Sequence, residues 1–431
     1  MNLNFEKIQR HIFAIAESKN ISMEEAENLL EKSVLILEAN EEINNSYALQ
    51  LAFFTCYNMG NRIFKGGVKC ILPIGAPNLL KTEGDSFNEA LNSLFSINQE
   101  VIAKLNSPKI LFGKSPKARN QVEVICSSWQ AGLNVYESER VSLKNRNSEL
   151  SLGACLSSSF ALFWAFEYTF EITGDLQTES FGYSLWNSSL KYQWFEKEAE
   201  GPENVKIPSK IWNVGLGHLG QSYIWTLSHF KKHNDLKFLL QDFDNLGIEN
   251  LGSQILSFAS QIGSPKTRVC LDFLSKMKIN CIIIEKKFVK NDQIDDSLYD
   301  YKVLITGLDN SISRSIINTD RFELCLDGAT NGSLLNFDSF TFRNLKLCEQ
   351  KPNEIWDPEN VKSNILHKNL HKMVVEKGGC GELTNFGIST PFVGLFGSCI
   401  LISELVKSCN SGKSSSIFSG KMRSTSSFST V

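Results

Sequence analysis

Short apolar runs alternate with segments of helical periodicity over residues 207–407. The apolar runs predict strands, and the segments in which apolar residues recur with the period of a helix predict helices. The expected strands are 211–214, 236–240, 279–285, 301–308, 322–326 and 337–342, and a helix is expected at 265–277. Strands that alternate with helices in this way predict an α/β fold with a doubly wound, mainly parallel sheet.

Residues 1–200 carry a mixed pattern that predicts a separate N-terminal α/β domain. Residues 1–60 are expected to be helical, since Ser22 and Glu25 form a capping box ahead of an apolar stripe. The basic stretch 108–119 is expected to be a solvated loop. Further along, we expect a strand at 68–73, a helix at 87–105, and a strand pair or one long strand at 122–135.

Two apolar stretches, 154–170 and 387–405, are nearly long enough to cross a membrane. Both are interrupted by Ser, Thr, Gly or Glu, so we expect buried core helices and no membrane partner. The segment 148–170 resembles the segment 381–407, because each is a polar loop that enters an apolar helix. This similarity suggests that the N-terminal domain is a degenerate copy of the fold that follows it.

Residues 408–431 differ from the rest of the chain in composition. They are rich in Ser and contain few apolar residues, so little of their surface can be buried. This segment is predicted to be a disordered tail. The polar stretch 185–208, which contains two prolines, is expected to link the two domains.

A glycine turn connects the first strand of the C-terminal half to the helix after it. Gly215, Gly217 and Gly220 stand in a G-x-G-x-x-G pattern, and Asp242 closes the following strand. Glycines let the backbone approach a phosphate closely, a helix N-terminus offers free N–H groups, and an acid at this spacing can hold a ribose hydroxyl. The pattern therefore indicates a Rossmann-like nucleotide site.

The residues that follow the glycine turn make the prediction more specific. Asp244, Asn250, Gln254 and Lys266 come next, and a later Thr-Gly-Leu-Asp-Asn segment contains Asp309. With this series, residues 207–407 resemble the ThiF/MoeB/ubiquitin-activating (E1-like) superfamily, whose members adenylate the C-terminal carboxylate of ubiquitin-like proteins or peptides. The long N-terminal part is similar to that of bacterial ubiquitin-like conjugation systems, some of them linked to antiviral defence.

The resemblance implies a role for each of these residues, with ATP and Mg²⁺ as cofactors. Gly215, Gly217 and Gly220 would cradle the phosphates, Asp242 would accept a hydrogen bond from the ribose, and Asp244 would belong to the same nucleotide site. Asn250 and Gln254 would hydrogen-bond the nucleotide, although either could instead cap a helix. Lys266 would pair with phosphate charge, and Asp309 would hold Mg²⁺, an ion that prefers one or two carboxylates plus phosphate oxygens.

This sequence departs from the family pattern at one position of the nucleotide site. The arginine of the N-x-x-R-Q segment is replaced by Ser253, so one phosphate-facing cation is missing. Another arginine could supply it, and the sequence does not decide which. The possible replacements are Arg62, Arg119, Arg268 and Arg314.

Many relatives pass the adenylated substrate to a cysteine before the final helix. Cys380 lies in that region, with His367 and His371 nearby in sequence, and Cys348 lies upstream. A thiolate nucleophile must be exposed and have a lowered pKa. Cys380 is therefore the predicted thioester nucleophile, with Cys348 as the second choice and a buried structural cysteine as the alternative.

Composition narrows the remaining possibilities. The 431 residues carry a net charge of -3, which gives no bulk attraction to nucleic acid. The 11 cysteines form no C-x-x-C pairs, and with no signal peptide at the start we expect reduced thiols, cytoplasmic localisation and no structural zinc.

The expected partners follow from the family. They are a ubiquitin-like protein or peptide C-terminus, a downstream conjugating protein, and either a second copy of the chain or an internal pseudo-dimer. Two other functions stay open from the sequence. An NAD-dependent oxidoreductase would use the glycine turn alone, and a catalytically weakened scaffold would fit the loss of arginine at Ser253.

Overall fold

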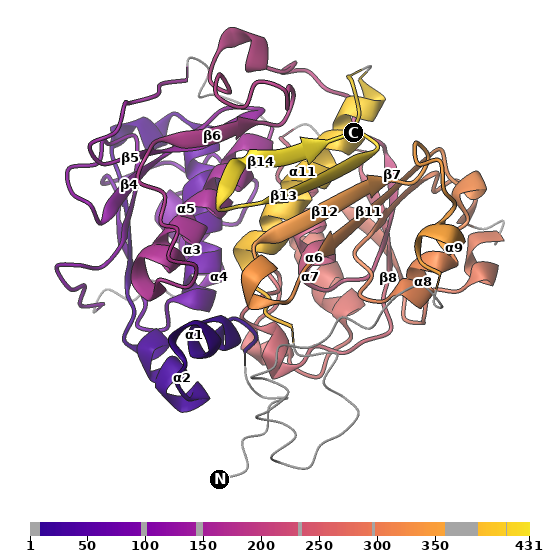
Figure 1. The fold of residues 1–431 in the computed structure, drawn as a ribbon, viewed down its shortest axis with the longest axis horizontal. Coiled ribbons are helices and arrows are strands. Elements are labelled where there is room, and N and C mark those ends of the chain that lie inside the picture. The colour runs from indigo at the N-terminus through magenta and orange to yellow at the C-terminus, as the bar shows by residue number, and fades with distance from the viewer. Residues whose placement is uncertain are drawn as a thin grey trace.

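Two β-sheets with helices packed between them make up the protein (Figure 1). The computed structural model describes residues 9–95, 101–143, 150–231, 235–294, 298–357, 387–410 and 412–431. One sheet has six strands in the order β2-β1-β3-β4-β5-β6, and the other has eight in the order β14-β13-β12-β11-β10-β7-β8-β9. The chain is therefore an α/β protein, as predicted.

The six-stranded sheet belongs to the N-terminal half. Its strands β2, β1, β3 and β4 are parallel, and β5 and β6 continue the sheet in antiparallel fashion. The strands are β1 (Leu35–Ala39), β2 (Val68–Ile71), β3 (Lys109–Phe112), β4 (Gln121–Cys126), β5 (Gln130–Val135) and β6 (Phe181–Ser184). The helices are α1 (Ile12–Lys19), α2 (Met23–Glu31), α3 (Tyr47–Ile63), α4 (Phe87–Leu94) and α5 (Leu152–Phe170).

The eight-stranded sheet belongs to the C-terminal half. Strands β9, β8, β7, β10 and β11 are parallel, which confirms the predicted doubly wound sheet, and three antiparallel strands follow. The strands are β7 (Lys210–Val214), β8 (Lys237–Gln241), β9 (Asn280–Ile284), β10 (Val303–Thr306), β11 (Leu324–Thr330), β12 (Ser339–Asn344), β13 (Ile417–Lys421) and β14 (Ser424–Thr430). The helices are α6 (His218–Ser228), α7 (Lys266–Lys276), α8 (Ser311–Ser315), α9 (Pro352–Ile355) and α11 (Pro391–Cys409).

The two halves share one order of elements. In each, a first parallel strand leads into a helix (β1 to α3, β7 to α6), and a long apolar helix later separates two antiparallel strands (α5 between β5 and β6, α11 between β12 and β13). The correspondence supports the degenerate-copy hypothesis. The N-terminal copy has no glycine turn, because β1 runs directly into residues 40–46, which contain no glycine.

The helices of the two halves pack on each other and form a shared core. Helix α5 packs against α3 and α11, and α11 packs against α6. At this junction Phe54 of α3 stacks on Trp225 of α6, with ring centroids 5.6 Å apart. Helix α11 is long and apolar enough to span a membrane, but 89% of its most apolar 18-residue window is buried inside the protein. Both predicted core helices are thus confirmed.

Three expectations for the N-terminal half are wrong. Residues 35–39, expected to be helical, form β1, which pairs with both β2 and β3. The predicted helix at 87–105 ends as α4 at Leu94. The supposed loop 108–119 contains β3, and its Lys109 donates to Glu38 of β1 at 2.7 Å, so a charged pair lies within the sheet.

The Ser-rich segment 408–431, predicted to be disordered, instead forms strands β13 and β14. They extend the eight-stranded sheet beyond β12, and alternate residues such as Phe418 and Phe428 are buried. Phe428 also packs edge-on against Tyr183 of β6, with ring centroids 4.8 Å apart. The segment is ordered because few but regularly spaced aromatic side chains fill the space between the two sheets.

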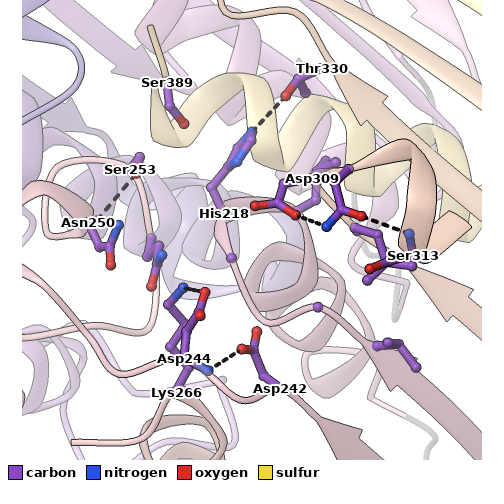
Figure 2. Close-up of a pocket in the computed structure, with 18 of the residues that line it drawn as sticks. His218, Asp242, Asp244, Asn250, Ser253, Lys266, Asp309, Ser313, Thr330 and Ser389 are labelled. Carbon is purple, nitrogen blue, oxygen red and sulfur yellow. Dashed lines mark hydrogen bonds and ion pairs between the residues drawn. The ribbon is translucent and has the colours of Figure 1, made fainter. Parts of the chain in front are cut away.

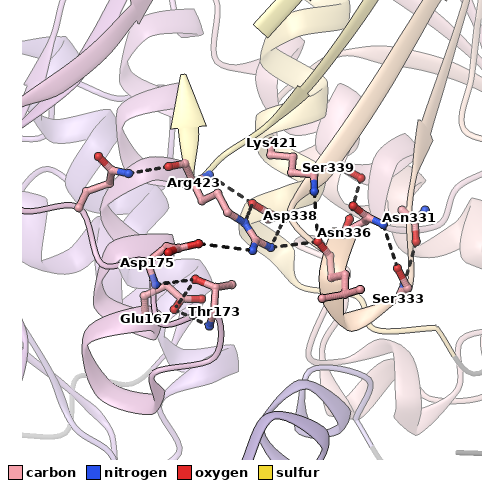
Figure 3. Close-up of polar contacts among 12 residues, drawn as sticks. Glu167, Thr173, Asp175, Asn331, Ser333, Asn336, Asp338, Ser339, Lys421 and Arg423 are labelled. Atoms are coloured by element: carbon pink, nitrogen blue, oxygen red, sulfur yellow. Dashed lines mark hydrogen bonds and ion pairs between the residues drawn. The ribbon is translucent and has the colours of Figure 1, made fainter. Parts of the chain in front are cut away.

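The turn between β13 and β14 is fixed by an ion-pair network (Figure 3). Arg423 donates through Nε and Nη2 to the two carboxylate oxygens of Asp338, at 2.8 and 2.7 Å. Asp338 is fully buried, and Arg423 Nη1 lies 4.0 Å from Asp175 of the N-terminal half. The arginine therefore ties the C-terminal hairpin to both halves of the molecule.

Candidate active site

A cavity of about 760 Å³ lies at the carboxyl ends of the parallel strands of the C-terminal sheet (Figure 2). It opens where β7 has β8 on one side and β10 on the other, so the chain order reverses at this point. Ligands of doubly wound sheets bind in the crevice at such a switch point. The cavity is lined by residues that follow β7, β8, β10 and β11 and by the segment before α11.

The glycine turn forms one wall of the cavity. Gly215 has a φ of +83°, and a Cβ at this position would lie 2.8 Å from the carbonyl oxygen of Gly307. Gly217 borders open space ahead of α6, so the first N–H groups of that helix can meet a ligand. Gly220 lies outside the cavity lining, where a side chain would clash with the Gly215 carbonyl. Its function is therefore to let the helix pack on the turn, and the predicted direct phosphate contact does not fit this placement.

Asp242 ties the end of β8 to the glycine turn. Its Oδ2 accepts a hydrogen bond from the Leu216 N–H at 2.6 Å, and its Oδ1 accepts one from the Asp244 N–H at 2.8 Å. Burial raises the pKa of this carboxyl, while Lys266 and the two N–H donors act to lower it. The carboxylate lies beside the turn as expected for a group that faces the ribose.

Lys266 and Asp244 form an ion pair inside the cavity. The Nζ of Lys266 lies 2.8 Å from Oδ2 of Asp244, and only 8% of the lysine surface is exposed. Lys266 is the first residue of α7, where a positive charge is unfavourable to the helix dipole. The pair compensates for that charge, and it also keeps a cation at the cavity surface where phosphate oxygens could replace Asp244.

Asn250 and Gln254 line the cavity, but their oxygens already have partners. The Oδ1 of Asn250 accepts from the Gly247 N–H at 3.1 Å and so caps a short 3-10 turn. The Oε1 of Gln254 accepts from Gln221 of α6 at 2.8 Å. Asn250 therefore caps a turn within the 247–257 loop, which is the alternative that the sequence left open, while Gln254 holds this loop against α6.

None of the four arginines expected to replace the residue missing at Ser253 is free for a phosphate. Arg62, from α3, is buried and donates to the carbonyls of Leu251, Ile255 and Ser257. Arg314 lines the cavity, but it donates to Asp327 and to two backbone carbonyls. Arg268 pairs with Glu285, and Arg119 is exposed outside the cavity lining.

A fifth arginine, Arg10, lines the cavity instead. The segment before α1 packs directly against Gly252. A Cβ added to this glycine would clash with the ring of His11 and lie 2.9 Å from Oε1 of Gln9. Arg10, which stands between Gln9 and His11 in sequence, is thus placed close in space to the neighbour of Ser253. Within the described residues its Nε has no hydrogen-bond partner. Nothing in the sequence separated this arginine from other surface charges.

Asp309 is exposed at the end of β10 and faces the cavity. Its Oδ1 accepts a hydrogen bond from the Asn310 amide at 2.9 Å. Over the described ranges, no group of three or more His, Cys, Asp or Glu side chains could hold a metal by itself. A single carboxylate suits Mg²⁺ that is brought in by a nucleotide, since phosphate oxygens then complete its coordination.

His218, the first residue of α6, also lines the cavity, and no role was predicted for it from the sequence. Burial, followed by the nearby charge of Arg10, lowers its pKa to about 4. The imidazole is therefore neutral at pH 7. It lies between Thr330 and Asp309 (Figure 2).

The predicted nucleophile Cys380 lies outside the described residues. Cys348 is within them, and burial raises its pKa. Burial likewise raises the pKa of every other described cysteine for which a shift is resolved, which is the opposite of what a thiolate nucleophile needs. The second choice, Cys348, therefore has the wrong environment.

Comparison with known protein families gives two matches along the chain. The family model described as the BilD C-terminal domain matches residues 207–412, and the one described as the BilD N-terminal domain matches residues 34–185. The Bacterial E1-like protein BilD of Collimonas sp. (strain OK412) is 26% identical over 97% of this chain and 93% of its own length. The NEDD8-activating enzyme E1 catalytic subunit of Caenorhabditis elegans is 27% identical over 33% of this chain and 32% of its own length.

Solved structures give a more distant similarity. The E. coli tRNA N6-threonylcarbamoyladenosine dehydratase TcdA has 15% sequence identity, with a TM-score of 0.35 over 47% of this chain and 86% of its own. The same enzyme in complex with ATP gives 14% identity and a TM-score of 0.34 over the same shares of the two chains.

Proposed function

Because this chain belongs to the E1-like (ThiF) superfamily, we propose that it is an ATP-dependent adenylyltransferase acting on the C-terminal carboxylate of a ubiquitin-like protein or peptide. One observation carries the proposal. The glycine turn after β7, Lys266 at the start of α7 and Asp309 after β10 line one cavity at the switch point of the sheet. An enzyme that used NAD would need neither the lysine nor the second aspartate.

The reaction needs charge stabilisation more than proton transfer. A carboxylate oxygen of the substrate forms a bond to the α-phosphorus of ATP, and the bond from that phosphorus to the bridging oxygen breaks, which releases pyrophosphate. Negative charge builds on the phosphate oxygens, so cations and N–H donors stabilise the transition state. The N-terminus of α6, Lys266 and Arg10 are the groups of this chain that can supply them.

The metal role belongs to Asp309. Mg²⁺ bound to ATP would supply further positive charge at the phosphates. The carboxylate of Asp309 would hold the metal–nucleotide complex, and Asn310 fixes the orientation of that carboxylate through its hydrogen bond.

The first half of the chain would serve the same site. It contributes Arg10 to the cavity, and Arg62 holds the loop that carries Ser253. A homodimer partner could supply such groups in a single-domain enzyme. In this chain the internal pseudo-dimer can supply them, which supports activity of one chain without a second copy.

A thioester step would follow adenylation. The thiolate of Cys380 would attack the acyl carbon of the adenylate, and AMP would leave with the bonding electrons, before transfer to a downstream conjugating protein. The raised pKa of Cys348, and of the other described cysteines with a resolved shift, leaves Cys380 as the preferred nucleophile. Cys380→Ala should retain adenylate formation and lose a reducible adduct with the substrate protein.

The decisive test is ATP–pyrophosphate exchange with the purified full chain. If a small protein ending in glycine is encoded beside this one, that protein is the substrate to assay. Exchange that depends on both Mg²⁺ and the intact terminus is the expected result. Isothermal titration calorimetry measures the affinity of the chain for ATP–Mg²⁺ and for NAD independently of turnover. Binding of NAD without binding of ATP–Mg²⁺ would overturn the proposal. Binding of ATP without exchange would favour a scaffold.

A further inference from the structure

We propose that His218, Thr330 and Ser389 form the subsite for the reacting end of the substrate, in which His218 binds the terminal carboxylate. The inference rests on the proposed adenylation function and specifies where its second substrate is held. All three side chains line the same cavity as the glycine turn. They come from the start of α6, the end of β11 and the segment before α11.

The imidazole of His218 is held in one orientation. Its Nε2 lies 3.3 Å from Oγ1 of Thr330, and on its other side the ring packs against the first turns of α11. A Cβ at Gly394 would lie only 2.7 Å from Cδ2 of the ring, so the helix and the imidazole are in close contact. Figure 2 shows the ring within the cavity, between Thr330 and Asp309. A ligand there would meet a fixed hydrogen-bonding group.

Ser389 provides a second, independent observation that points to a ligand. The residue is only 8% exposed, lines the cavity, and within the described parts of the chain its Oγ has no hydrogen-bond partner. Buried hydroxyl groups nearly always have a partner. An oxygen of a bound substrate would satisfy this hydroxyl.

The chemistry of the subsite differs from that of the phosphate side. Lys266 and Arg10 are full cations, which suit phosphate oxygens. His218 is neutral at pH 7, and Thr330 and Ser389 are neutral hydroxyl groups. One proton lies between His218 and Thr330: when the Thr330 hydroxyl donates to Nε2, Nδ1 of the neutral ring carries the N–H that donates to the carboxylate. This N–H and the Ser389 hydroxyl orient a carboxylate without neutralising it, so its oxygen keeps the electron density needed to attack phosphorus. The N–H groups at the start of α6 add a favourable partial charge.

The narrow end of the cavity is bounded by backbone. Ile388 donates its N–H to the Gly332 carbonyl at 2.8 Å, and a Cβ at Gly332 would lie 2.6 Å from the Cα of Gly387. These two segments are therefore in direct contact. Their contact fixes the position of Ser389 relative to the end of β11.

Two defined probes separate the subsite from the nucleotide site. AMP occupies only the nucleotide site, whereas 5′-O-(glycylsulfamoyl)adenosine carries an acyl group in place of the activated substrate terminus. Titration calorimetry of the full chain gives the affinity for each, and the ratio reports the acyl subsite. We expect wild type to bind the acyl analogue more tightly than AMP.

The substitutions His218→Ala and Ser389→Ala should each reduce that ratio by about tenfold while the AMP affinity is unchanged, since each removes one hydrogen bond to the acyl end. His218→Asn keeps a donor and should restore part of the ratio. Ser315→Ala, on α8 outside the cavity lining, is the matched control. Ser389→Ala removes one small hydroxyl, so it keeps the test valid if the histidine variant is unstable.

Three results would overturn the subsite. They are an equal affinity of wild type for the two probes, an equal loss of both affinities in His218→Ala and Ser389→Ala, or a ratio unchanged by both substitutions. Failure of wild type to bind AMP at all would instead reject the nucleotide site of the proposed function, and the subsite with it.

Discussion

At the scale of single residues, the site is a set of charges that neutralise one another until a nucleotide binds. Lys266 is paired with Asp244, and Asp242 accepts two backbone N–H groups. Phosphate oxygens would compete with Asp244 for the lysine, so nucleotide binding should exchange one ion pair for another. In the proposed function, this exchange would give ATP a favourable interaction at small electrostatic cost.

Removal of the lysine or of the proposed metal ligand tests that view. Lys266→Ala should lower the ATP–pyrophosphate exchange rate by roughly 10- to 100-fold, the range expected for loss of one charged hydrogen bond. Asp309→Ala should abolish exchange through loss of the Mg²⁺ ligand. Arg268→Ala is the control, because this arginine lies on α7 near Lys266 but pairs with the exposed side of Glu285. Exchange retained in Asp309→Ala would reject the metal role.

Arg10 is expected to replace the cation missing at Ser253. Arg10→Ala should reduce exchange by about the same factor as Lys266→Ala, with little change in the free energy of unfolding, because the Nε of this residue has no partner in the described structure. Arg10→Lys should recover part of the activity, and Arg119→Ala should resemble wild type. Activity of Arg10→Ala equal to wild type would assign the missing charge elsewhere.

Site residues could be predicted from the sequence where they belong to a motif of neighbouring positions, and could not where their position depends on contacts between distant parts of the chain. Gly215 and Asp242 were identified by the spacing of the glycine turn and the following acid, and Lys266 by its place in the E1-like family pattern that the sequence resembles. Arg10 and His218 depend on contacts across the fold. No periodicity brings Arg10 to Ser253 along more than 200 residues of chain, and His218 stands in a variable position of the glycine pattern.

At the scale of elements, Arg423 in the turn of the C-terminal hairpin anchors the hairpin to Asp338, outside the hairpin. Asp338 is buried and receives both of its side-chain donors from this arginine. Arg423→Ala leaves a buried carboxylate without its cation and should reduce the free energy of unfolding by about 3–5 kcal/mol. Urea denaturation measures this change. The double variant Arg423→Ala/Asp338→Ala should be less destabilised than the single one; equal or greater loss would place the stability of the hairpin in its aromatic contacts.

The element that carries Arg10 should respond to acid. His11 is fully buried, its ring nitrogens have no hydrogen-bond partner in the described residues, and burial lowers its pKa to about 3. Since the pKa is lower in the folded state, the unfolded chain binds the extra proton below pH 6.5. The contribution of neutral His11 to the free energy of unfolding is therefore fully present above pH 6.5 and is lost as the pH falls toward 3.

Substitution of the histidine isolates its share of that pH dependence. Between about pH 6 and pH 4, His11→Phe should reduce the slope of unfolding free energy against pH by about 1.4 kcal/mol per pH unit, the value for one proton. Denaturation curves at several pH values measure the slope. Parallel curves for the two proteins would show that His11 is not the responsible group, and His218 would then be the next to test.

The errors at this scale have a common cause. Strand β1 was expected to be a helix because Val34 and Leu37 continue the apolar stripe of the helix before it, and a strand buried in a parallel sheet has no alternating pattern to distinguish it. The tail was expected to be disordered because serines dominate its composition. The order of β13 and β14 comes from partners elsewhere in the fold, chiefly β12, Asp338 and Tyr183.

At the scale of the whole molecule, the two halves form one hydrophobic core. A single cluster of buried residues runs from α1 through α3 and α5 to α6 and α11, so neither half covers its helices by itself. The C-terminal half contains the proposed nucleotide site, yet Arg62 from α3 fixes the loop beside it through three backbone carbonyls.

Residues 207–431 expressed alone should therefore lack a cooperative unfolding transition and bind ATP at least tenfold more weakly than the full chain, because large apolar helix faces become exposed. Co-expression with residues 1–206 should restore both properties if the halves assemble as they do within one chain.

Arg62→Met in the full chain separates the loss of apolar packing from the loss of the loop contacts, since it keeps the packing but leaves the loop carbonyls without donors. It should weaken ATP binding more than it lowers the unfolding midpoint. An isolated C-terminal half that unfolds cooperatively and binds ATP with full affinity would show that the N-terminal half serves only another purpose.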